Sequence, residues 1–180
     1  MARAIFPGLL GATFDELPEP LQELHCGEES AEWHGEASLR GAQNLAGRMV
    51  AALFNLPAHD HRTDARVSIK VTPDGETWTR SFGGKEFRSH LSLGTGLEAG
   101  LMCERFGILT VAMAITWKDD KLWFVPRRWR VGPVPLPSAL LPGGDTFECE
   151  HDGLFAFDVR VEVPIIGLVA AYRGTLQKQD

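Results

Sequence analysis

Alternation of apolar and polar residues with a period of two dominates the carboxyl-terminal part of the chain. Between residues 155 and 163 phenylalanines and valines fall on one face of an extended segment, and the other face carries Ala156, Asp158, Arg160 and Glu162. This is the pattern of a half-buried β-strand, because successive side chains point to opposite faces. Asp152-Gly153 just before it is typical of a type I′ turn, which needs positive φ at both central residues. Residues 146–176 therefore predict two or three antiparallel strands.

The same alternation, broken by short turn sequences, extends back to Arg66. Further strands are predicted at 33–40, 66–72, 77–82, 87–93, 97–106, 109–117 and 122–131. Short strands at intervals of about 8 to 12 residues are typical of an all-β meander. A sheet of about eight to ten strands avoids exposed edges by closing into a barrel or folding into a sandwich. Because the connections are short and sequential, we favour a mainly β fold, an antiparallel meander forming a barrel or strongly curled half-barrel.

Helices are expected in two places. Residues 5–25 predict two short helical pieces near the amino end, punctuated by Pro18 and Pro20. One further helix after the first strand is predicted, with Asn44 as its N-cap and Pro57 as its end.

Loops and domain limits follow from the same reading. The polar segment 58–64 and the proline-rich segment 133–144 are expected to be loops, since proline lacks the donor that a central strand needs. We expect residues 1–180 to form a single domain, in which residues 1–27 are a helical cap and residues 32–176 are the β-rich body. The cap would cover one mouth of the barrel.

Composition narrows the class of protein. A chain of 180 residues that is 44% hydrophobic suits one domain with a substantial core. A formal net charge of −6 argues against nucleic acid as a partner. No apolar run approaches the ~18 residues of a transmembrane helix, and the amino end lacks a signal-peptide pattern. Three dispersed cysteines without CxxC spacing predict free thiols, so a cytoplasmic location is expected.

An ordered set of short motifs links the chain to a known family. The motifs are FDELPEPLQELH (14–25), WTRSFGGKEFRS (78–89), ERFG (104–107), VGPVPLP (131–137), FAFDV (155–159) and PIIGLVAAYRGTL (164–176). In this order they resemble the bacterial domain of unknown function 4166 family, over nearly the whole chain. Members of the family occur alone and at the carboxyl end of larger proteins. The family has no assigned activity, so the resemblance implies no catalytic residue.

Two charged residues share strand faces with large apolar residues. Trp78, Arg80 and Phe82 lie on one face of a predicted strand, and Met102, Glu104 and Phe106 lie on one face two strands later. If these faces point inward, Arg80 and Glu104 need each other or a ligand, because a buried unpaired charge is costly. We prefer the interpretation that both are rim or solvent-facing charges. The alternative is a polar site inside an apolar cavity, the usual form of a small-molecule pocket.

The only dense basic cluster is Arg127 to Arg130, RRWR. A guanidinium fork suits carboxylate or phosphate recognition, with Trp129 as a stacking platform. On a regular strand Arg127 and Trp129 would share one face. The preferred interpretation is an exposed strand that pairs with acidic neighbours such as Glu148 and Glu150.

Metal and catalytic signatures are weak. His59, Asp60 and His61 lie in one loop, but adjacent ligands without a partner cluster indicate a solvated loop rather than a metal site. His25 is explained by its place at a helix end, where a cation is favourable. The chain contains no GxSxG, P-loop, GxGxxG or HExxH motif. We therefore expect no metal and no cofactor, and the catalytic residues are unknown.

Three functions stay open at this point. The first is a binding module for a hydrophobic or lipid-like small molecule. The second is an enzyme of unknown reaction that uses Glu104 and Arg80. The third is an interaction or regulatory domain with an unknown protein partner, in which Trp123, Trp129 and the proline-rich loop meet that partner. The candidate ligand-binding residues are Trp78, Arg80, Phe82, Ser89, Met102, Glu104, Phe106, Arg127, Trp129 and Tyr172.

Overall fold

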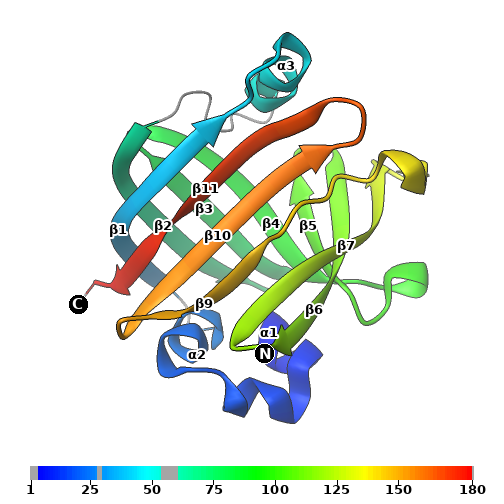
Figure 1. Ribbon diagram of the computed structural model, residues 1–180. Helices are drawn as coiled ribbons and strands as arrows, with labels where there is room; N and C mark the ends of the chain where they lie inside the picture. Colours follow the sequence, from blue (N-terminus) through cyan, green and yellow to red (C-terminus); the bar gives the residue numbers. More distant parts are fainter. Residues whose placement is uncertain (1–3, 28–29, 54–60, 180) are drawn as a thin grey trace.

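Ten antiparallel strands close into a β-barrel in the computed structural model, which describes residues 4–27, 30–53 and 61–179 (Figure 1). The strands are β1 (Ser30–Gly41), β2 (His61–Thr72), β3 (Gly75–Phe82), β4 (Lys85–Leu93), β5 (Met102–Phe106), β6 (Leu109–Lys118), β7 (Lys121–Val131), β9 (Phe147–His151), β10 (Leu154–Val163) and β11 (Gly167–Lys178). A two-residue strand, β8 (Val134–Pro135), pairs with β7 outside the ring.

The strands follow one another around the barrel in chain order. Each strand from β1 to β6 pairs with the next one along the chain, and β7 pairs with β9. β9, β10 and β11 continue the meander, and β11 pairs with β1 to close the ring. The predicted antiparallel meander is confirmed, and its form is a closed barrel.

Side-chain alternation fills the barrel. In β2, Ala65, Val67 and Ile69 are buried while the residues between them are exposed. The predicted hairpin turn is present, because Asp152 and Gly153 have φ of 51° and 77°. The alternation of side chains, with the register set by the turns, thus points every second side chain of a strand toward the core.

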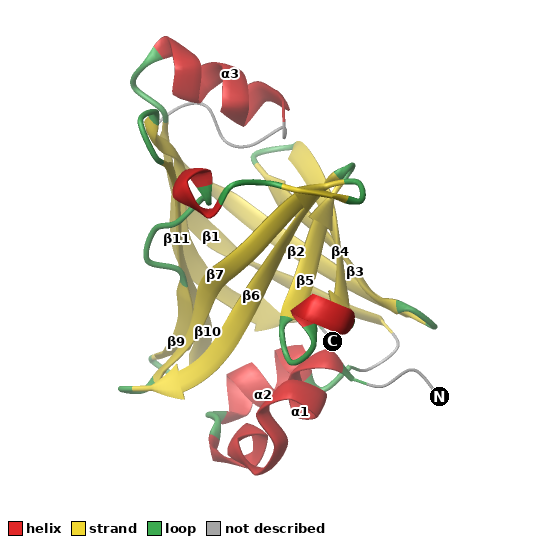
Figure 2. Cartoon of the chain, turned by 90° about the vertical axis from the view of Figure 1, so that its right-hand side faces the viewer, coloured by secondary structure: helices red, strands yellow, loops and turns green. Residues whose placement is uncertain are grey.

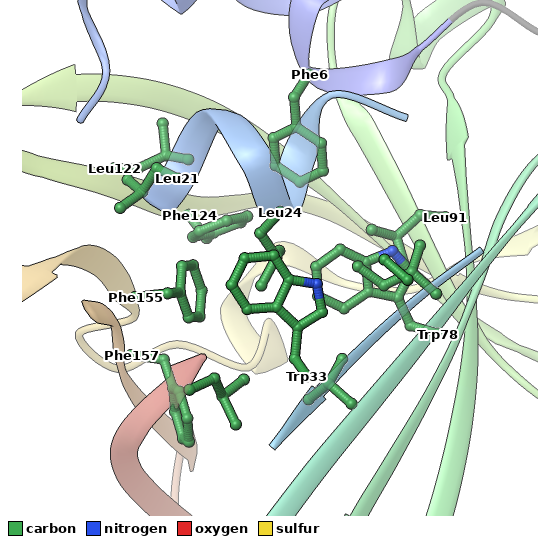
Figure 3. Close-up of a cluster of buried hydrophobic side chains, with 14 of the residues drawn as sticks. Phe6, Leu21, Leu24, Trp33, Trp78, Leu91, Leu122, Phe124, Phe155 and Phe157 are labelled. Atoms are coloured by element: carbon green, nitrogen blue, oxygen red, sulfur yellow. The ribbon is translucent and has the colours of Figure 1, made fainter. Parts of the chain in front are cut away.

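The amino-terminal segment closes one end of the barrel (Figure 2). It comprises the helix α1 (Ile5–Leu10), a 3₁₀ segment (Gly11–Glu16) and the helix α2 (Glu19–His25). Phe6, Leu21 and Leu24 are buried, and Figure 3 shows them beside Phe124 and Phe155 of the barrel. The predicted short helices near the amino end are confirmed, and we call residues 4–27 the cap.

The helix α3 (Leu45–Leu53) lies at the opposite end of the barrel (Figure 2). Its predicted N-cap is confirmed, because the Oδ1 atom of Asn44 accepts a hydrogen bond of 2.7 Å from the Gly47 amide. Leu45 and Met49 of its apolar stripe are exposed. Pro57, predicted to end the helix, lies outside the described residues.

Two predicted boundaries are wrong. The strand predicted over 97–106 begins at Met102, because residues Gly96–Glu98 form a 3₁₀ turn and Gly100 has a φ of 80°. The polar segment 58–64 is not all loop, since β2 begins at His61, which pairs with Leu39. The first four residues of β2 are polar on both faces of the strand and are mostly exposed, so no apolar alternation marked them as strand.

Candidate functional site

A hydrogen-bonded network of three side chains faces the barrel interior from three neighbouring strands. Arg80 comes from β3, Ser89 from β4 and Glu104 from β5. The Nη1 atom of Arg80 donates to Ser89 Oγ at 2.8 Å and to Glu104 Oε1 at 3.0 Å, and Ser89 Oγ donates to Glu104 Oε1 at 2.7 Å. The Arg80 and Glu104 side chains are only 16% and 13% exposed. The preferred interpretation of these two as rim or solvent-facing charges is wrong.

Aromatic rings hold the guanidinium in place. The Cζ atom of Arg80 lies 4.9 Å from the ring centroid of Trp78 and 5.8 Å from that of Phe87. A cation near an aromatic face is attracted by the ring quadrupole, more strongly when both are desolvated. Trp78 is itself oriented, because its Nε1 atom donates to Glu76 Oε2 at 2.9 Å. The charged network is therefore pre-organised by the strands that carry it.

The network keeps hydrogen-bonding capacity that no neighbour uses. Both bonds from Arg80 leave through Nη1, and both bonds to Glu104 arrive at Oε1. Within the described residues, Arg80 Nε and Nη2 and Glu104 Oε2 make no hydrogen bond. The Tyr172 hydroxyl likewise has no hydrogen-bond partner there. These groups offer donors and acceptors together, since guanidinium only donates, carboxylate only accepts and a phenol does both.

A small cavity of about 90 Å³ lies in the barrel interior beside this network. Its lining is mostly apolar, with Arg80, Glu104, Glu148 and Tyr172 among the polar residues. The apolar lining comprises Phe6, Val67, Trp78, Phe82, Leu91, Met102, Met113, Phe124, Phe155, Phe157, Val159 and Leu176. Pockets for drug-sized ligands have volumes of about 300–1,000 Å³. With the cap in this position, the cavity has room only for a polar group or a very small molecule.

Tyr172 borders the cavity from β11 and is packed among aromatic rings. Its ring centroid lies 5.1 Å from that of Phe82 and 6.1 Å from that of Phe157. Burial raises the pKa of Tyr172 to about 12, while nearby Arg80 lowers it and Glu104 raises it further. The hydroxyl is therefore uncharged at neutral pH and can both donate and accept a hydrogen bond.

His25 and Glu148 form a second interior contact that the sequence analysis missed. His25 Nε2 lies 2.6 Å from Glu148 Oε2, and the His25 side chain is fully buried. The His25 ring stacks on Phe6 at 3.6 Å between centroids. His25 does end the helix α2, as predicted. The predicted pairing of Glu148 with the basic cluster is wrong, because Glu148 contacts His25 instead. Alternation on β9 would instead place apolar Phe147 and Cys149 inward, whereas the structure puts these two on the outer groove and Glu148 on the cavity, so no local signal identified the contact.

Buried polar atoms without partners gather where the cap meets the barrel. Among the described residues, His25 Nδ1, Trp33 Nε1 and Glu76 Oε1 are buried and find no hydrogen-bond partner. His25 lies 5.7 Å from Trp78 between ring centroids, and Trp78 binds Glu76. A buried polar group that loses its partner costs free energy relative to the hydrated state. The contact between the cap and the barrel thus leaves one cap atom, His25 Nδ1, and two barrel atoms unsatisfied among the described residues.

The structure separates the basic cluster from this interior site. A β-bulge between Ala112 and Met113 leaves Arg127 without an opposite residue, so the expected common face of Arg127 and Trp129 is wrong. Arg127 is exposed, and Trp129 Nε1 donates to the Pro137 carbonyl at 2.9 Å.

The other expected contacts of this region also differ. Arg130 pairs with Glu98 at 3.1 Å rather than with Glu148 or Glu150. Phe106 packs half-buried against the core and does not line the cavity. Trp78, Arg80, Phe82, Met102, Glu104 and Tyr172 do line it, with Ser89 bonded to the network.

A wider groove of about 640 Å³ lies on the outer surface of β1, β9, β10 and β11. It is open, and its charged walls include Arg62, which already pairs with Glu36 at 2.8 Å while both stay exposed. Exposed charges remain hydrated and contribute little to recognition. The interior cavity is the stronger candidate because its polar groups are removed from solvent.

The described part of the chain offers little support for a metal-binding site or a reactive cysteine. No group of three or more histidine, cysteine, aspartate or glutamate side chains is placed there to hold a metal ion. His59 and Asp60 lie outside the described residues. Burial raises the pKa of the Cys103 thiol to about 12, and its hydrogen bond to Glu98 adds to the rise. Among the described helices, none has the length and apolar character needed to cross a bilayer.

Sequence comparison agrees with this domain. The model of a family described as a domain of unknown function (DUF4166) matches residues 17–176. The match covers the helix α2 and all the strands of the barrel except the last two residues of β11. No curated protein matches the chain.

Proposed function

The chain belongs to the family described as a domain of unknown function (DUF4166), and we propose that it binds a small, mainly apolar molecule inside its barrel. One observation carries the proposal. Arg80, Glu104 and Tyr172 present unused hydrogen-bonding groups to an apolar, desolvated cavity. Such groups are the usual anchors of small-molecule pockets, and a ligand would satisfy them where the protein does not.

The other two functions have less support. An enzyme using Glu104 would have one free carboxylate oxygen, Oε2, but within the described residues the carboxylate is bonded only to Arg80 and Ser89, so no second acid–base group is in hydrogen-bond contact with it. In a partner surface centred on Trp123 and Trp129, neither indole N–H would be available to the partner, because both donate to backbone carbonyls of the chain itself. We also propose a cytoplasmic location, which the three free cysteines support.

The test begins with protein purified from its own host and measured by native mass spectrometry. We expect a stoichiometric mass adduct, which solvent extraction releases and identifies. The informative variant is the double substitution Arg80→Met with Glu104→Gln. Removing one partner of a buried pair leaves an uncompensated charge, whereas replacing both avoids that cost. The double variant should therefore stay folded and lose the adduct.

An outer ion pair on β4 supplies the matched control. Arg88 Nη2 lies 2.6 Å from Glu86 Oε1, and both side chains are exposed. The double substitution Arg88→Met with Glu86→Gln makes the same chemical change outside the barrel and should retain the adduct. An adduct lost equally from both variants, or found in neither the parent protein nor the control, would contradict the proposal.

A further inference from the structure

We infer that the cavity selects an uncharged polar group, one that both accepts and donates hydrogen bonds, in preference to a carboxylate. This inference rests on the proposed function and names the chemical class of the ligand's polar end. A primary amide attached to an apolar chain is the simplest molecule of this class. The inference follows from the charges that face the cavity, from the unused hydrogen-bonding groups and from the apolar remainder of the lining.

The first step is the charge around the cavity. One guanidinium, Arg80, faces two carboxylates, Glu104 and Glu148, in the lining. Glu104 already neutralises Arg80 at 3.0 Å, and Glu148 is held by His25 at 2.6 Å. Tyr172, with a pKa of about 12, adds no charge at neutral pH. A ligand carboxylate would bring a third negative charge into an interior where unpaired charge is costly.

The second step is the pattern of unused groups. Arg80 Nε and Nη2 are donors, whereas Glu104 Oε2 is an acceptor on the other side of the same ion pair. A primary amide can satisfy both kinds of group, because its carbonyl oxygen accepts a hydrogen bond from Arg80 and its NH₂ group donates one to Glu104. A carboxylate has only acceptors, so one of its oxygens would meet Glu104 Oε2 without a proton between them. The Tyr172 hydroxyl can serve either partner.

The third step concerns the rest of the ligand. Phe82, Phe157, Met102 and Met113 surround the network with apolar surface, so the part of the ligand beyond its polar end is apolar. The cavity of about 90 Å³ admits the polar end first. A longer apolar tail must displace Phe6 of the cap, which lines the cavity on that side.

The experiment compares two probes of equal chain length, octanamide and octanoate, by isothermal titration of the full chain at neutral pH. We expect octanamide to bind at least about tenfold more tightly than octanoate. Equal affinities, or tighter binding of octanoate, would overturn the inference and leave the proposed function standing. Failure of both probes to bind would also overturn the inference, while the adduct from the host decides the proposed function separately.

Variants show whether the charge of Glu104 causes the preference. Glu104→Gln keeps the shape of the side chain and removes its charge, so octanoate should gain affinity and the ratio between the probes should shrink. Glu86→Gln removes an exposed carboxylate outside the barrel and should preserve the ratio. Glu148→Gln removes the second carboxylate of the lining and should shrink the ratio in the same direction, which covers the case in which Glu104→Gln fails to fold. An unchanged ratio in the folded lining variants, or a ratio lost in Glu86→Gln, would assign the preference to another cause.

Discussion

Tyr172 reports directly on the polarity of the barrel interior, because it is the only tyrosine of the chain. Its ring is enclosed by Phe82, Phe87 and Phe157. Burial raises its pKa to about 12 from the ordinary value of 10.0, since removal from water disfavours the charged tyrosinate. The same enclosure keeps the hydroxyl uncharged at neutral pH.

We predict that spectrophotometric titration of the folded protein will show tyrosinate forming near pH 12, and near pH 10 in denaturant. The folded state then holds its proton more tightly than the unfolded state. The stabilisation is complete below pH 10 and is lost as the pH rises through the folded pKa. A folded inflection near pH 10 would mean that Tyr172 is hydrated.

At the scale of elements, two glycines allow β1 and β11 to approach closely. Gly35 of β1 and Gly174 of β11 face the interior in paired strands. A Cβ atom on Gly174 would collide with the Glu36 carbonyl oxygen, and one on Gly35 would collide with the Thr175 carbonyl oxygen. Glycine within a strand often marks a bend where another backbone comes near. The closing pair of the barrel therefore depends on the missing side chains.

We predict that Gly174→Ala will lower the free energy of unfolding by about 2 kcal/mol, because the added methyl group would overlap the Glu36 carbonyl oxygen and overpacking typically costs about 1–3 kcal/mol. Urea denaturation followed by circular dichroism measures it. Gly143→Ala is the matched control, since a Cβ atom there meets nothing within 4 Å. Equal losses in the two variants would remove close strand approach as the cause.

At the scale of the whole molecule, the cap completes the barrel. Phe6 is 1% exposed and contributes both to the core and to the wall of the cavity. The cap also leaves buried polar atoms without partners, among them His25 Nδ1. Apolar burial thus holds the cap in place while the polar atoms oppose it. This balance supports the proposal that a ligand tail could displace the cap.

We predict that Phe6→Ala will cost about 3–5 kcal/mol of unfolding free energy, as expected for a large buried aromatic. The same variant should bind octanamide more tightly than the parent protein does, because removing the ring enlarges the cavity. Leu9→Ala is the control from the same helix, where the side chain is half-buried and a smaller loss is expected. Reduced octanamide binding by folded Phe6→Ala would contradict the proposed role of the cap.

Much of the fold was predictable from the sequence because its information is local. The period of two identified strands such as β10, and Asp152-Gly153 identified its turn. The same period placed Arg80 between Trp78 and Phe82 on one face, but it could not say whether that face points inward. The bulge on β7 escaped prediction, since it moves Arg127 out of phase without any change in the local pattern.

Partnerships between distant residues depended on the closed barrel. Arg80 and Glu104 are 24 residues apart, and His25 and Glu148 are 123 residues apart. No local pattern carries such a pairing, because the distance between the side chains depends on strand register, on closure of the ring and on the seating of the cap. Alternation and turn chemistry therefore specified the strands and their order. Three-dimensional packing specified which charges meet inside, because only the folded barrel removes them from water together.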